Sequence, residues 1–390
     1  MSKKPLFIRL AQPTYGAYLL RHHHIQAVGM EQLSALAPPF LVMGNHVHTF
    51  DPFFVSSASP IHIRWVAGAY LFKMVGLRSL MERWIQAISK QQGRSDLYTI
   101  RTISEALKQG DVVGLFPEGT RTWDGEPVGF DMAIAKLVKI FKVPIVLLNL
   151  EGFYGLRPRW ARTRRRGVGT IRVMEALTVE QISNLSVDEL YAHLQTVLNH
   201  SNRRFQEQTP APYHGTRLAE GLEQVLYLCP DCQKISTLTS KANTICCTSC
   251  SYEARLDIYD KLHIQKGDHP FSDVAEWHAW EKKIITSEQG SDLDYPFDRG
   301  VLFQKGEAKR LRTLSKDFTL HMERDGFSIK TQKGEHFAFA FSDIGSMIIN
   351  AKNTVELFHK QQLYRIRIQQ RGSILKYVER YQARQKGETP

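Results

Sequence analysis

The chain has 390 residues, of which 43% are hydrophobic and 23% are charged. This length exceeds one ordinary domain and predicts two or three, and the composition is typical of folded chains and excludes a disordered one. The formal net charge of +12 indicates an anionic partner, either nucleic acid or an anionic membrane surface.

The first twenty residues contain no pattern typical of a signal peptide, because the apolar stretch after Lys4 is interrupted early by Arg9. Apolar runs elsewhere have strand length, well short of the roughly eighteen residues that a membrane-spanning helix needs. We therefore expect a cytoplasmic protein, peripheral on the cytoplasmic face of the membrane. The apolar side chains between Leu6 and Leu20 predict short helices that either rest in the membrane interface or cover the core.

Residues 1–176 alternate short apolar runs with helical stretches, which predicts an α/β domain with a mixed sheet. The expected strands lie at 40–43, 63–66, 112–116, 145–150 and 170–173. The expected helices lie at 51–57, 71–84, 97–108 and 131–140.

A histidine and an aspartate stand five positions apart at the start of the first of these helices. One turn of chain lets Asp51 hydrogen-bond one ring nitrogen of His46, and the other nitrogen can then act as a general base. His48 is a competing base, but no carboxylate stands at the matching spacing, which favours a role in lining the pocket. The amides of a helix beginning near Thr49 could stabilise a developing oxyanion.

A second polar motif follows the expected strand at 112–116. Glu118, Gly119, Thr120 and Arg121 place a carboxylate, a glycine, a hydroxyl and a guanidinium directly after a buried strand. Such a loop is typical of anion binding, because a guanidinium pairs with phosphate through two parallel hydrogen bonds. The spacing of His46 and Asp51 arises easily by chance, whereas the second motif is rare, and their order along the chain favours one shared site.

The chain resembles the glycerolipid acyltransferase family, which includes lysophosphatidate acyltransferase. The resemblance is carried by Asn45-His46-x4-Asp51-Pro52, Phe116-Pro117-Glu118-Gly119-Thr120-Arg121 and Val143-Pro144-Ile145. It implies that His46 deprotonates a hydroxyl of a glycerolipid acceptor, which attacks the thioester of acyl-CoA or acyl carrier protein, and that Asp51 orients His46. It also implies that residues 118–121 hold the polar head of the acceptor, with Arg121 on the phosphate.

One segment departs from the pattern of that family. An arginine that contacts the phosphate usually ends an isoleucine-centred stretch between the two motifs, and Gln92 occupies that position here. Lys90 or Arg94 could substitute for it, or the acceptor carries less negative charge at this point. The departure concerns the identity of the acceptor more than the chemistry of transfer.

Residues 177–224 are expected to form a helical connector, with a capping box that starts at Ser186. Just before the end of the first domain, ten residues without an acid contain six arginines. These are Arg157, Arg159, Arg162, Arg164, Arg165 and Arg166. A loop this basic would dock on anionic headgroups, or it is a solvated loop without a partner.

Four cysteines in residues 225–258 form two pairs with the spacing of a zinc ribbon. Cys229 and Cys232 are followed, after fourteen residues, by Cys247 and Cys250. Each two-residue gap lets both thiolates face one point, so we expect a structural Zn²⁺ with no catalytic role. Cys246 could replace Cys247, although its spacing to Cys250 fits less well. Disulfides are disfavoured by the expected cytoplasmic location.

Residues 259–298 are expected to be a linker with an amphipathic helix that starts near Asp273. From 299 to 390 the pattern changes to short runs typical of strands, at 318–322, 327–330, 336–341, 344–349, 355–358 and 363–368. A helix at 373–385 closes the chain. Six or seven strands and a terminal helix resemble a pleckstrin-homology-like barrel.

These observations favour an acyltransferase that moves a fatty acyl group to a lysophospholipid or glycerol phosphate, with 1-acylglycerol-3-phosphate as the expected acceptor. A lipid-binding scaffold without activity is the first alternative, because Gln92 replaces the usual arginine. A nucleic-acid-binding protein is a remote alternative, since it leaves His46 and Glu118 unexplained, and we expect no nucleic-acid partner.

Overall fold

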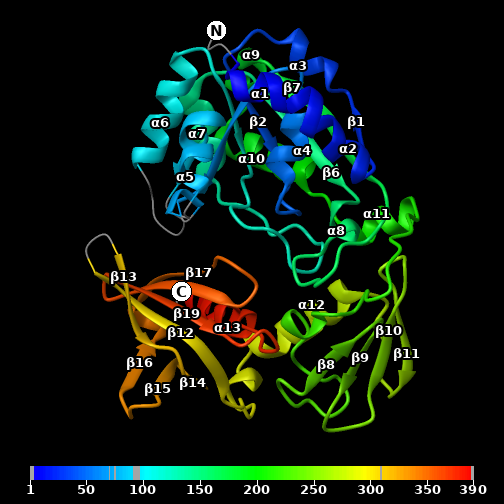
Figure 1. Ribbon diagram of the computed structural model, residues 1–390, viewed down its shortest axis with the longest axis vertical. Helices are drawn as coiled ribbons and strands as arrows, with labels where there is room; N and C mark the ends of the chain where they lie inside the picture. The colour runs from blue at the N-terminus through cyan, green and yellow to red at the C-terminus, as the bar shows by residue number, and fades with distance from the viewer. Residues whose placement is uncertain (1–3, 70, 74–75, 91–96, 308–309, 388–390) are drawn as a thin grey trace. The chain divides into compact units, whose positions relative to one another are not determined.

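The computed structural model describes residues 4–69, 71–73, 76–90, 97–307 and 310–387. The chain divides into two compact units. The amino-terminal unit contains residues 1–159 and 165–213, and the carboxy-terminal unit contains residues 160–164 and 214–390. Figure 1 shows helices on both faces of the central sheet in the first unit, and mainly strands in the second. Among the helices of the described residues, none is long and apolar enough to cross a membrane.

A seven-stranded sheet with the order β1-β7-β6-β2-β5-β3-β4 forms the centre of the amino-terminal unit. Its strands are β1 (Ile25–Val28), β2 (Phe40–Gly44), β3 (Ile63–Gly68), β4 (Ile88–Lys90), β5 (Val112–Leu115), β6 (Ile145–Glu151) and β7 (Gly169–Leu177). Only β6 and β7 pair antiparallel among the described strands of this sheet, and the other neighbours are parallel. The mixed sheet expected from the sequence is confirmed, and β1 and β4 are additional short strands at its two edges.

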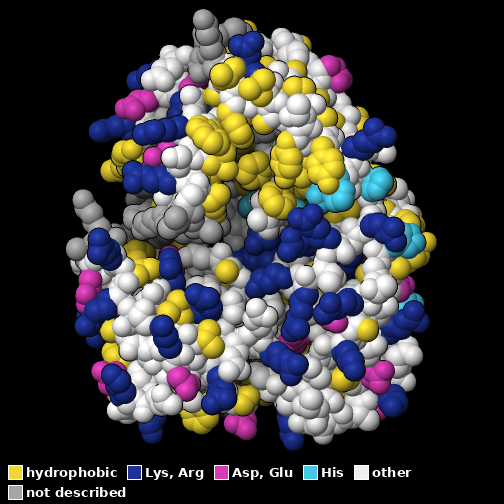
Figure 2. Space-filling view, in the orientation of Figure 1, with side chains coloured by type: hydrophobic (Ala, Val, Ile, Leu, Met, Phe, Trp, Pro, Cys, Tyr) yellow, Lys and Arg dark blue, Asp and Glu magenta, His cyan; other side chains and the backbone are white. Residues whose placement is uncertain are grey.

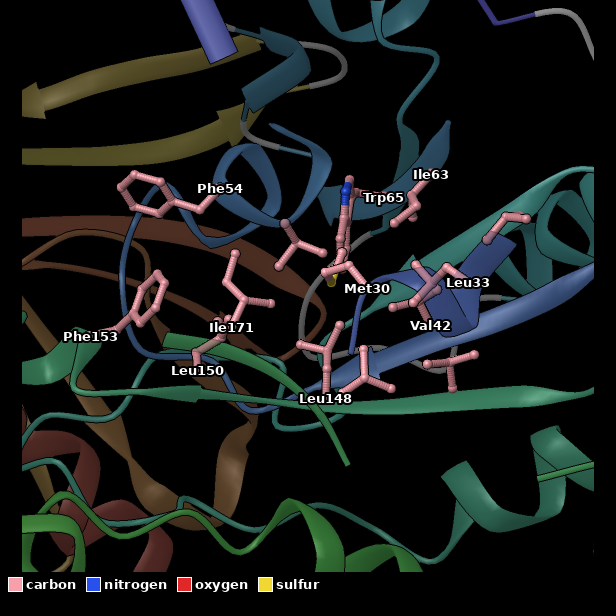
Figure 3. Close-up of a cluster of buried hydrophobic side chains, with 14 of the residues drawn as sticks. Met30, Leu33, Val42, Phe54, Ile63, Trp65, Leu148, Leu150, Phe153 and Ile171 are labelled. Atoms are coloured by element: carbon pink, nitrogen blue, oxygen red, sulfur yellow. The ribbon is translucent and has the colours of Figure 1, made fainter. Parts of the chain in front are cut away.

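The buried strands send alternate side chains into two hydrophobic clusters, because successive residues of a strand point to opposite faces. Phe40 and Val42 of β2 join the cluster that Figure 3 shows, which also contains Phe54. Leu41 and Met43 point into the other cluster. The first face is covered by α2 (Ala17–His22), α3 (Glu31–Ala35) and α4 (Asp51–Ala58), and α1 (Leu6–Ala11) contributes no buried residue. The second face is covered by α6 (Leu97–Lys108), α7 (Ala133–Phe141), α9 (Val179–Asn184) and α10 (Val187–Leu198).

The stretch of residues 71–84 is helical at every described residue except Gly76, but it is not the single continuous helix that the sequence predicts. The described residues of this stretch form three short elements, η2 (Leu71–Lys73), α5 (Leu77–Ser79) and η3 (Leu80–Trp84). Gly76 lies between the first two with a φ of +81°, in the left-handed region that interrupts a right-handed helix. The apolar residues of this stretch recur at helical spacing on both sides of Gly76, although the backbone is not helical at Gly76 itself.

The first part of the carboxy-terminal unit is a four-stranded antiparallel sheet with the order β11-β10-β9-β8. Its strands are β8 (Leu238–Lys241), β9 (Thr244–Cys247), β10 (Glu253–Leu256) and β11 (Leu262–Lys266). Helix α12 (Val274–Thr286) follows, capped by the Asp273 side chain, which accepts from the Glu276 N–H at 3.0 Å. The helix start expected at Asp273 is thereby confirmed.

The rest of this unit is an eight-stranded antiparallel sheet with the order β16-β15-β14-β12-β19-β18-β17, and β13 pairs with β12. Its strands are β12 (Asp298–Glu307), β13 (Arg310–Ser315), β14 (Phe318–Glu323), β15 (Gly326–Thr331), β16 (His336–Ala340), β17 (Ile344–Ile349), β18 (Thr354–His359) and β19 (Gln362–Ile368), and α13 (Leu375–Gly387) closes the chain. The six strand-like runs all form strands. Among the described residues β16 and β17 each pair with one neighbour, so the hydrogen-bonded path is open, and the likeness to a pleckstrin-homology barrel stays a prediction.

Candidate functional site

The two polar motifs of the amino-terminal unit meet at one edge of the sheet. β2 and β5 pair in parallel with Met43 opposite Leu115, and His46 and Glu118 each follow three residues later. Because parallel strands end at the same edge, this register brings both loops together. The backbone N–H of His46 donates to Glu118 Oε1 at 3.1 Å and joins the motifs directly.

Asp51 fixes the imidazole of His46. Its buried Oδ2 accepts three hydrogen bonds of 2.8 Å, from His46 Nδ1 and from the backbone N–H groups of Val47 and His48. A carboxylate in this position favours the tautomer with the proton on Nδ1, which leaves Nε2 as the basic nitrogen. The pairing predicted from the spacing of His46 and Asp51 is therefore present.

The amides at the start of α4 are arranged differently from the oxyanion site that the sequence predicts. The helix begins at Asp51, and the N–H groups of Val47 and His48 donate to its carboxylate. The N–H of Phe50 donates to His48 Nδ1 at 3.0 Å, and the N–H of Asp51 donates to the His48 carbonyl at 3.1 Å. The Val47 and His48 amides hold the carboxylate that orients His46, and the Phe50 and Asp51 amides are bonded to His48. Binding of an oxyanion by other amides at the start of α4 stays a prediction.

His48 is a packing residue. It is buried, and its ring lies against Phe54 with a centroid separation of 5.4 Å and against Phe50 at 5.8 Å. Its Nδ1 accepts the Phe50 amide. These contacts support the prediction that His48 lines the site and is not the competing base.

The His46 ring stacks on an aromatic pair. Its centroid lies 4.4 Å from that of Phe116, which in turn stacks on Trp65 at 4.8 Å. The side chain of His46 remains 21% exposed. Burial lowers the pKa of His46 below its ordinary value of 6.5, and the charges of Arg121 and Arg159 lower it further, whereas Asp51 raises it. The imidazole is therefore held in its neutral form at neutral pH.

Glu118 clamps the two loops around His46. Besides the His46 amide on Oε1, it accepts the Val128 N–H on Oε2 at 3.2 Å. The Thr122 N–H donates to the His46 carbonyl at 3.2 Å, so both backbone groups of His46 are held by the second motif. Burial raises the pKa of Glu118 to about 7, and the Asp51 charge contributes in the same direction.

Two arginines border the loop of residues 118–121. Arg121 is half-buried, and its Nη1 donates to Thr49 Oγ1 at 3.0 Å, which spans the two motifs. Arg159 is 3% exposed, and its Nη1 donates to Thr120 Oγ1 and to the Arg121 carbonyl, each at 2.9 Å. Its guanidinium carbon lies 4.3 Å from the centre of the Trp123 ring. Arg159 thus fixes the loop that presents Arg121.

The structure gathers most, but not all, of the predicted substrate-binding residues. Glu118, Thr120 and Arg121 contact either His46, Thr49 or Arg159 in the ways given above, and Gly119 has a φ of +67° with open space where a side chain would lie. Lys90 ends β4, which is separated from β2 by β5 and β3 in the sheet. Arg94 and Gln92 lie outside the described residues.

Sequence reasoning placed Arg159 only in a basic loop. The structure buries Arg159 and Arg165, and Arg162 Nη2 pairs with Glu223 Oε1 at 2.7 Å. These three side chains are therefore engaged within the protein, although Arg162 is exposed, as are Arg164 and Arg166. A run of arginines carries no pattern that separates the buried members from the exposed ones.

The four cysteines predicted to bind metal come together in the carboxy-terminal unit. One sulfur each from Cys229, Cys232, Cys247 and Cys250 lies within 4.8 Å of the others. Cys246 is outside this group, which resolves the alternative between it and Cys247. All five cysteines are free.

Residues 24–150 match the family model described as Acyltransferase. The matched region contains β2, α4 and β5 with both polar motifs. No curated protein matches the chain.

Among solved structures, the chain is similar to the 1-acyl-sn-glycerophosphate (LPA) acyltransferase PlsC from Thermotoga maritima. The identity is 21%, the TM-score is 0.44, and the match covers 52% of this chain and 79% of that chain.

Proposed function

We propose that the amino-terminal unit is an O-acyltransferase that moves a fatty acyl group from a thioester to a hydroxyl of a lysophospholipid or glycerol phosphate, with 1-acylglycerol-3-phosphate as the acceptor. The observation that carries the proposal is the hydrogen bond of 2.8 Å between His46 Nδ1 and the buried Asp51 carboxylate, inside an acyltransferase-family domain. An alcohol is a poor nucleophile until a base shares its proton, and a neutral imidazole held in one tautomer supplies that base.

In the proposed reaction, His46 Nε2 accepts the proton of the acceptor hydroxyl while the hydroxyl oxygen attacks the thioester carbonyl. The new C–O ester bond forms, the C–S bond breaks, and the proton on His46 passes to the departing thiolate of coenzyme A or acyl carrier protein. Asp51 stabilises the imidazolium that exists between these two proton transfers. No group outside this set is needed to balance the reaction.

The charges around His46 support a phosphate on the acceptor. Arg121 and Arg159 both lower the pKa of His46, which means that a positive field reaches the imidazole. A phosphate paired with Arg121 would offset that field and make His46 a stronger base when the acceptor is bound. We assign the bidentate contact to Arg121 and a positioning role to Arg159, which is too deeply buried to be the first contact of a ligand.

We also propose that the amino-terminal helices contact an anionic membrane, where the acceptor resides. Leu6, Leu10, Tyr15 and Tyr18 are more than half exposed on α1, η1 (Gln12–Gly16) and α2. Figure 2 shows hydrophobic side chains gathered over this part of the molecule. An exposed apolar patch on a chain of net charge +12 suits an anionic lipid surface.

The test is turnover of lysophosphatidate with labelled acyl-CoA by the purified chain and by His46→Ala. We expect a loss of at least about 100-fold in the variant, since general-base catalysis contributes roughly 100- to 10,000-fold. His48→Ala is the matched control and is expected to keep most of the activity if it folds. Turnover that persists unchanged in His46→Ala would contradict the mechanism. No turnover with any lysolipid or with glycerol phosphate would favour the inactive scaffold.

A further inference from the structure

The four clustered cysteines have the separations of ligands around one tetrahedral ion. Cys229 Sγ lies 3.6 Å from Cys250 Sγ, and Cys232 Sγ lies 3.7 Å from Cys247 Sγ. Thiolates at about 2.3 Å from a tetrahedral zinc ion are about 3.8 Å apart. Sulfurs joined as a disulfide would be about 2.0 Å apart. The cluster is therefore spaced for a metal and not for two disulfides.

The two Cys-x-x-Cys segments also share one backbone arrangement. The backbone N–H groups of Asp231 and Cys232 donate to the Cys229 sulfur. In the second segment, the N–H groups of Ser249 and Cys250 donate to the Cys247 sulfur, with a distance of 3.3 Å for Ser249. Amides aimed at a sulfur stabilise negative charge on it, as metal-bound thiolates require. In each Cys-x-x-Cys segment, the sulfur of the first cysteine therefore accepts hydrogen bonds from two backbone N–H groups.

We propose that Cys229, Cys232, Cys247 and Cys250 bind one Zn²⁺ as thiolates, and that this ion holds the four-stranded sheet against α12 and α13. Four thiolates fill a tetrahedral coordination sphere, so the ion has no open position for a substrate and acts structurally. This proposal is independent of the proposed acyl transfer.

The chain on either side of Cys229 is tied to α12. Glu281 Oε2 accepts the backbone N–H groups of Tyr227 and Leu228 at 3.0 Å each, and Trp277 Nε1 donates to the Leu228 carbonyl at 3.1 Å. Glu281 and Trp277 are both fully buried on that helix. The residues that lead into the first metal ligand are therefore part of the buried contact with α12.

A second contact reaches α13 from the loop between the two cysteine pairs. Lys376 Nζ donates to Ser236 Oγ at 2.7 Å and also pairs with Asp298 Oδ2 at 2.7 Å. Lys376 is fully buried, so its charge depends on these partners. Ser236 lies between Cys232 and Cys247, and loss of the ion would loosen the segment that carries it. The metal is thus expected to stabilise more than the small sheet itself.

Metal content of the full chain, purified under reducing conditions, tests the site. We expect one zinc per chain by elemental analysis of the wild type. When a mercurial reagent blocks the thiols, the same amount of zinc should be released and bind a metallochromic dye. Reduced, metal-free protein is expected to take up Co²⁺ with the visible absorption of a tetrahedral thiolate complex. Only trace metal together with no cobalt complex would overturn the proposal, and iron in place of zinc would overturn the identity of the ion.

Two serine variants separate the ligands from the remaining cysteine. Cys250→Ser is expected to lose the zinc, whereas Cys246→Ser is the matched control and is expected to keep it. Equal zinc in both variants would contradict the assignment. If Cys250→Ser does not fold, the release of zinc to the dye from wild-type protein still tests the site.

Hydrogen exchange tests the structural role. After the zinc is removed from the wild type, we expect faster exchange at residues 227–250, in α12 and in α13, and unchanged exchange in β2, β5 and β6. Faster exchange confined to residues 229–250 would contradict the link to the helices.

Discussion

Asp51 is the residue on which the geometry of the candidate active site depends. One oxygen of its carboxylate holds the imidazole and two backbone amides of the same loop. An asparagine at this position would keep one acceptor oxygen but lose the negative charge that all three donors face. A change at Asp51 therefore moves the base, its tautomer and the loop together.

The pH dependence of acyl transfer should contain two steps. Glu118 takes up a proton near its pKa of about 7, and since both of its oxygens accept backbone amides, we expect a modest loss of rate as pH falls through 7. His46 is active only when neutral, and burial places its pKa below 6.5, so the rate should fall about tenfold per pH unit only below that value.

Two variants assign these steps in a profile of kcat/KM against pH. In Glu118→Gln, which cannot ionise, the step near 7 should vanish and the acidic step remain. In Asp51→Asn, the charge that raises the pKa of His46 is lost, so the acidic step should move to lower pH while the maximal rate falls. In Glu118→Gln, where the step near 7 is absent, a fall in rate that begins above pH 6.5 would contradict the role given to His46.

Arg159→Ala should weaken acyl transfer although the side chain is buried. The variant loses the bonds to Thr120 Oγ1 and to the Arg121 carbonyl, and misplacement of a binding loop by about 1 Å can cost roughly 100-fold in rate. We expect KM for the phosphate-bearing acceptor to rise more than KM for acyl-CoA, and the pKa of His46 to rise because a positive charge is removed.

Arg166→Ala is the control for this variant, because Arg166 belongs to the same run and is exposed. It should leave both Michaelis constants unchanged. Equal effects of the two changes on KM would show that the charge of the run, and not the position of Arg159, matters for acceptor binding.

For individual residues, the sequence predicts a role that depends on a partner nearby in the chain. It does not predict a role that depends on burial against distant residues. His46 and Asp51 are five positions apart, so one turn of chain is enough to pair them. Arg159 follows Thr120 by 39 positions, and its role depends on the loop packing around Trp123. No local pattern carries that information.

Among the elements, the loop between β5 and α7 has a backbone requirement that bears directly on the candidate site. Its turn is closed by Thr122 Oγ1, which accepts the Gly125 N–H at 3.0 Å and donates to Asp124 Oδ1 at 3.1 Å. Gly125 has a φ of +93°, and a Cβ there would lie 2.8 Å from the Asn202 Cβ. The same turn holds the His46 carbonyl through the Thr122 amide.

Gly125→Ala should therefore destabilise the amino-terminal unit more than Gly129→Ala. Both glycines have a positive φ, which costs an alanine roughly 1–2 kcal/mol, but nothing lies within 4 Å of a Cβ at Gly129. The overlap at Gly125 should add about 1–3 kcal/mol. Thermal unfolding measures the difference, and equal shifts in Tm would indicate that the loop can move away from Asn202.

Helices and strands are predicted well where their own residues form a clear hydrophobic pattern. β2, β5 and β6 are continuous apolar runs because they are buried on both faces, and their positions are predicted closely. β12 pairs with β13, β14 and β19, and β13 pairs with β12, so these two strands form through contacts with strands elsewhere in the chain and their own sequences give little signal. The break at Gly76 depends on one backbone angle, which the helical periodicity of its neighbours conceals.

At the scale of the whole molecule, the net charge of +12 and the exposed apolar residues of α1 and α2 should act together on lipid vesicles. We expect binding to anionic vesicles that weakens as salt is raised, and little binding to zwitterionic ones. Leu6→Glu combined with Leu10→Glu should reduce partitioning by at least about tenfold, because each leucine contributes about 1.5–3 kcal/mol when buried.

Ile140→Glu is the control for this experiment. Ile140 is 65% exposed on α7, comparable to Leu6 and Leu10, so the change adds one negative charge, half that of the double variant, elsewhere on the unit. An equal loss of vesicle binding in this variant would mean that net charge alone, and not the amino-terminal helices, sets the affinity.

The whole-molecule division into units could not be predicted from composition, because residues 160–164 belong to the carboxy-terminal unit while the chain before and after them belongs to the other. Trp160 is fully buried, and its carbonyl accepts from Lys352 Nζ at 3.2 Å. The residues Pro, Gly, Asp, Glu, Lys and Arg are not distributed in this five-residue segment in a way that distinguishes it from an ordinary surface loop.

This excursion limits how the protein can be divided or recombined. The chain passes between the units at three points, so no single cut yields both in complete form, and a chain shortened at residue 213 would leave Trp160 without the surroundings that bury it. Arg159 is the residue immediately before that tryptophan. An exchange of carboxy-terminal units between homologous proteins would therefore have to exchange residues 160–164 as well, or it would disturb the backbone next to Arg159, which holds the loop of residues 118–121.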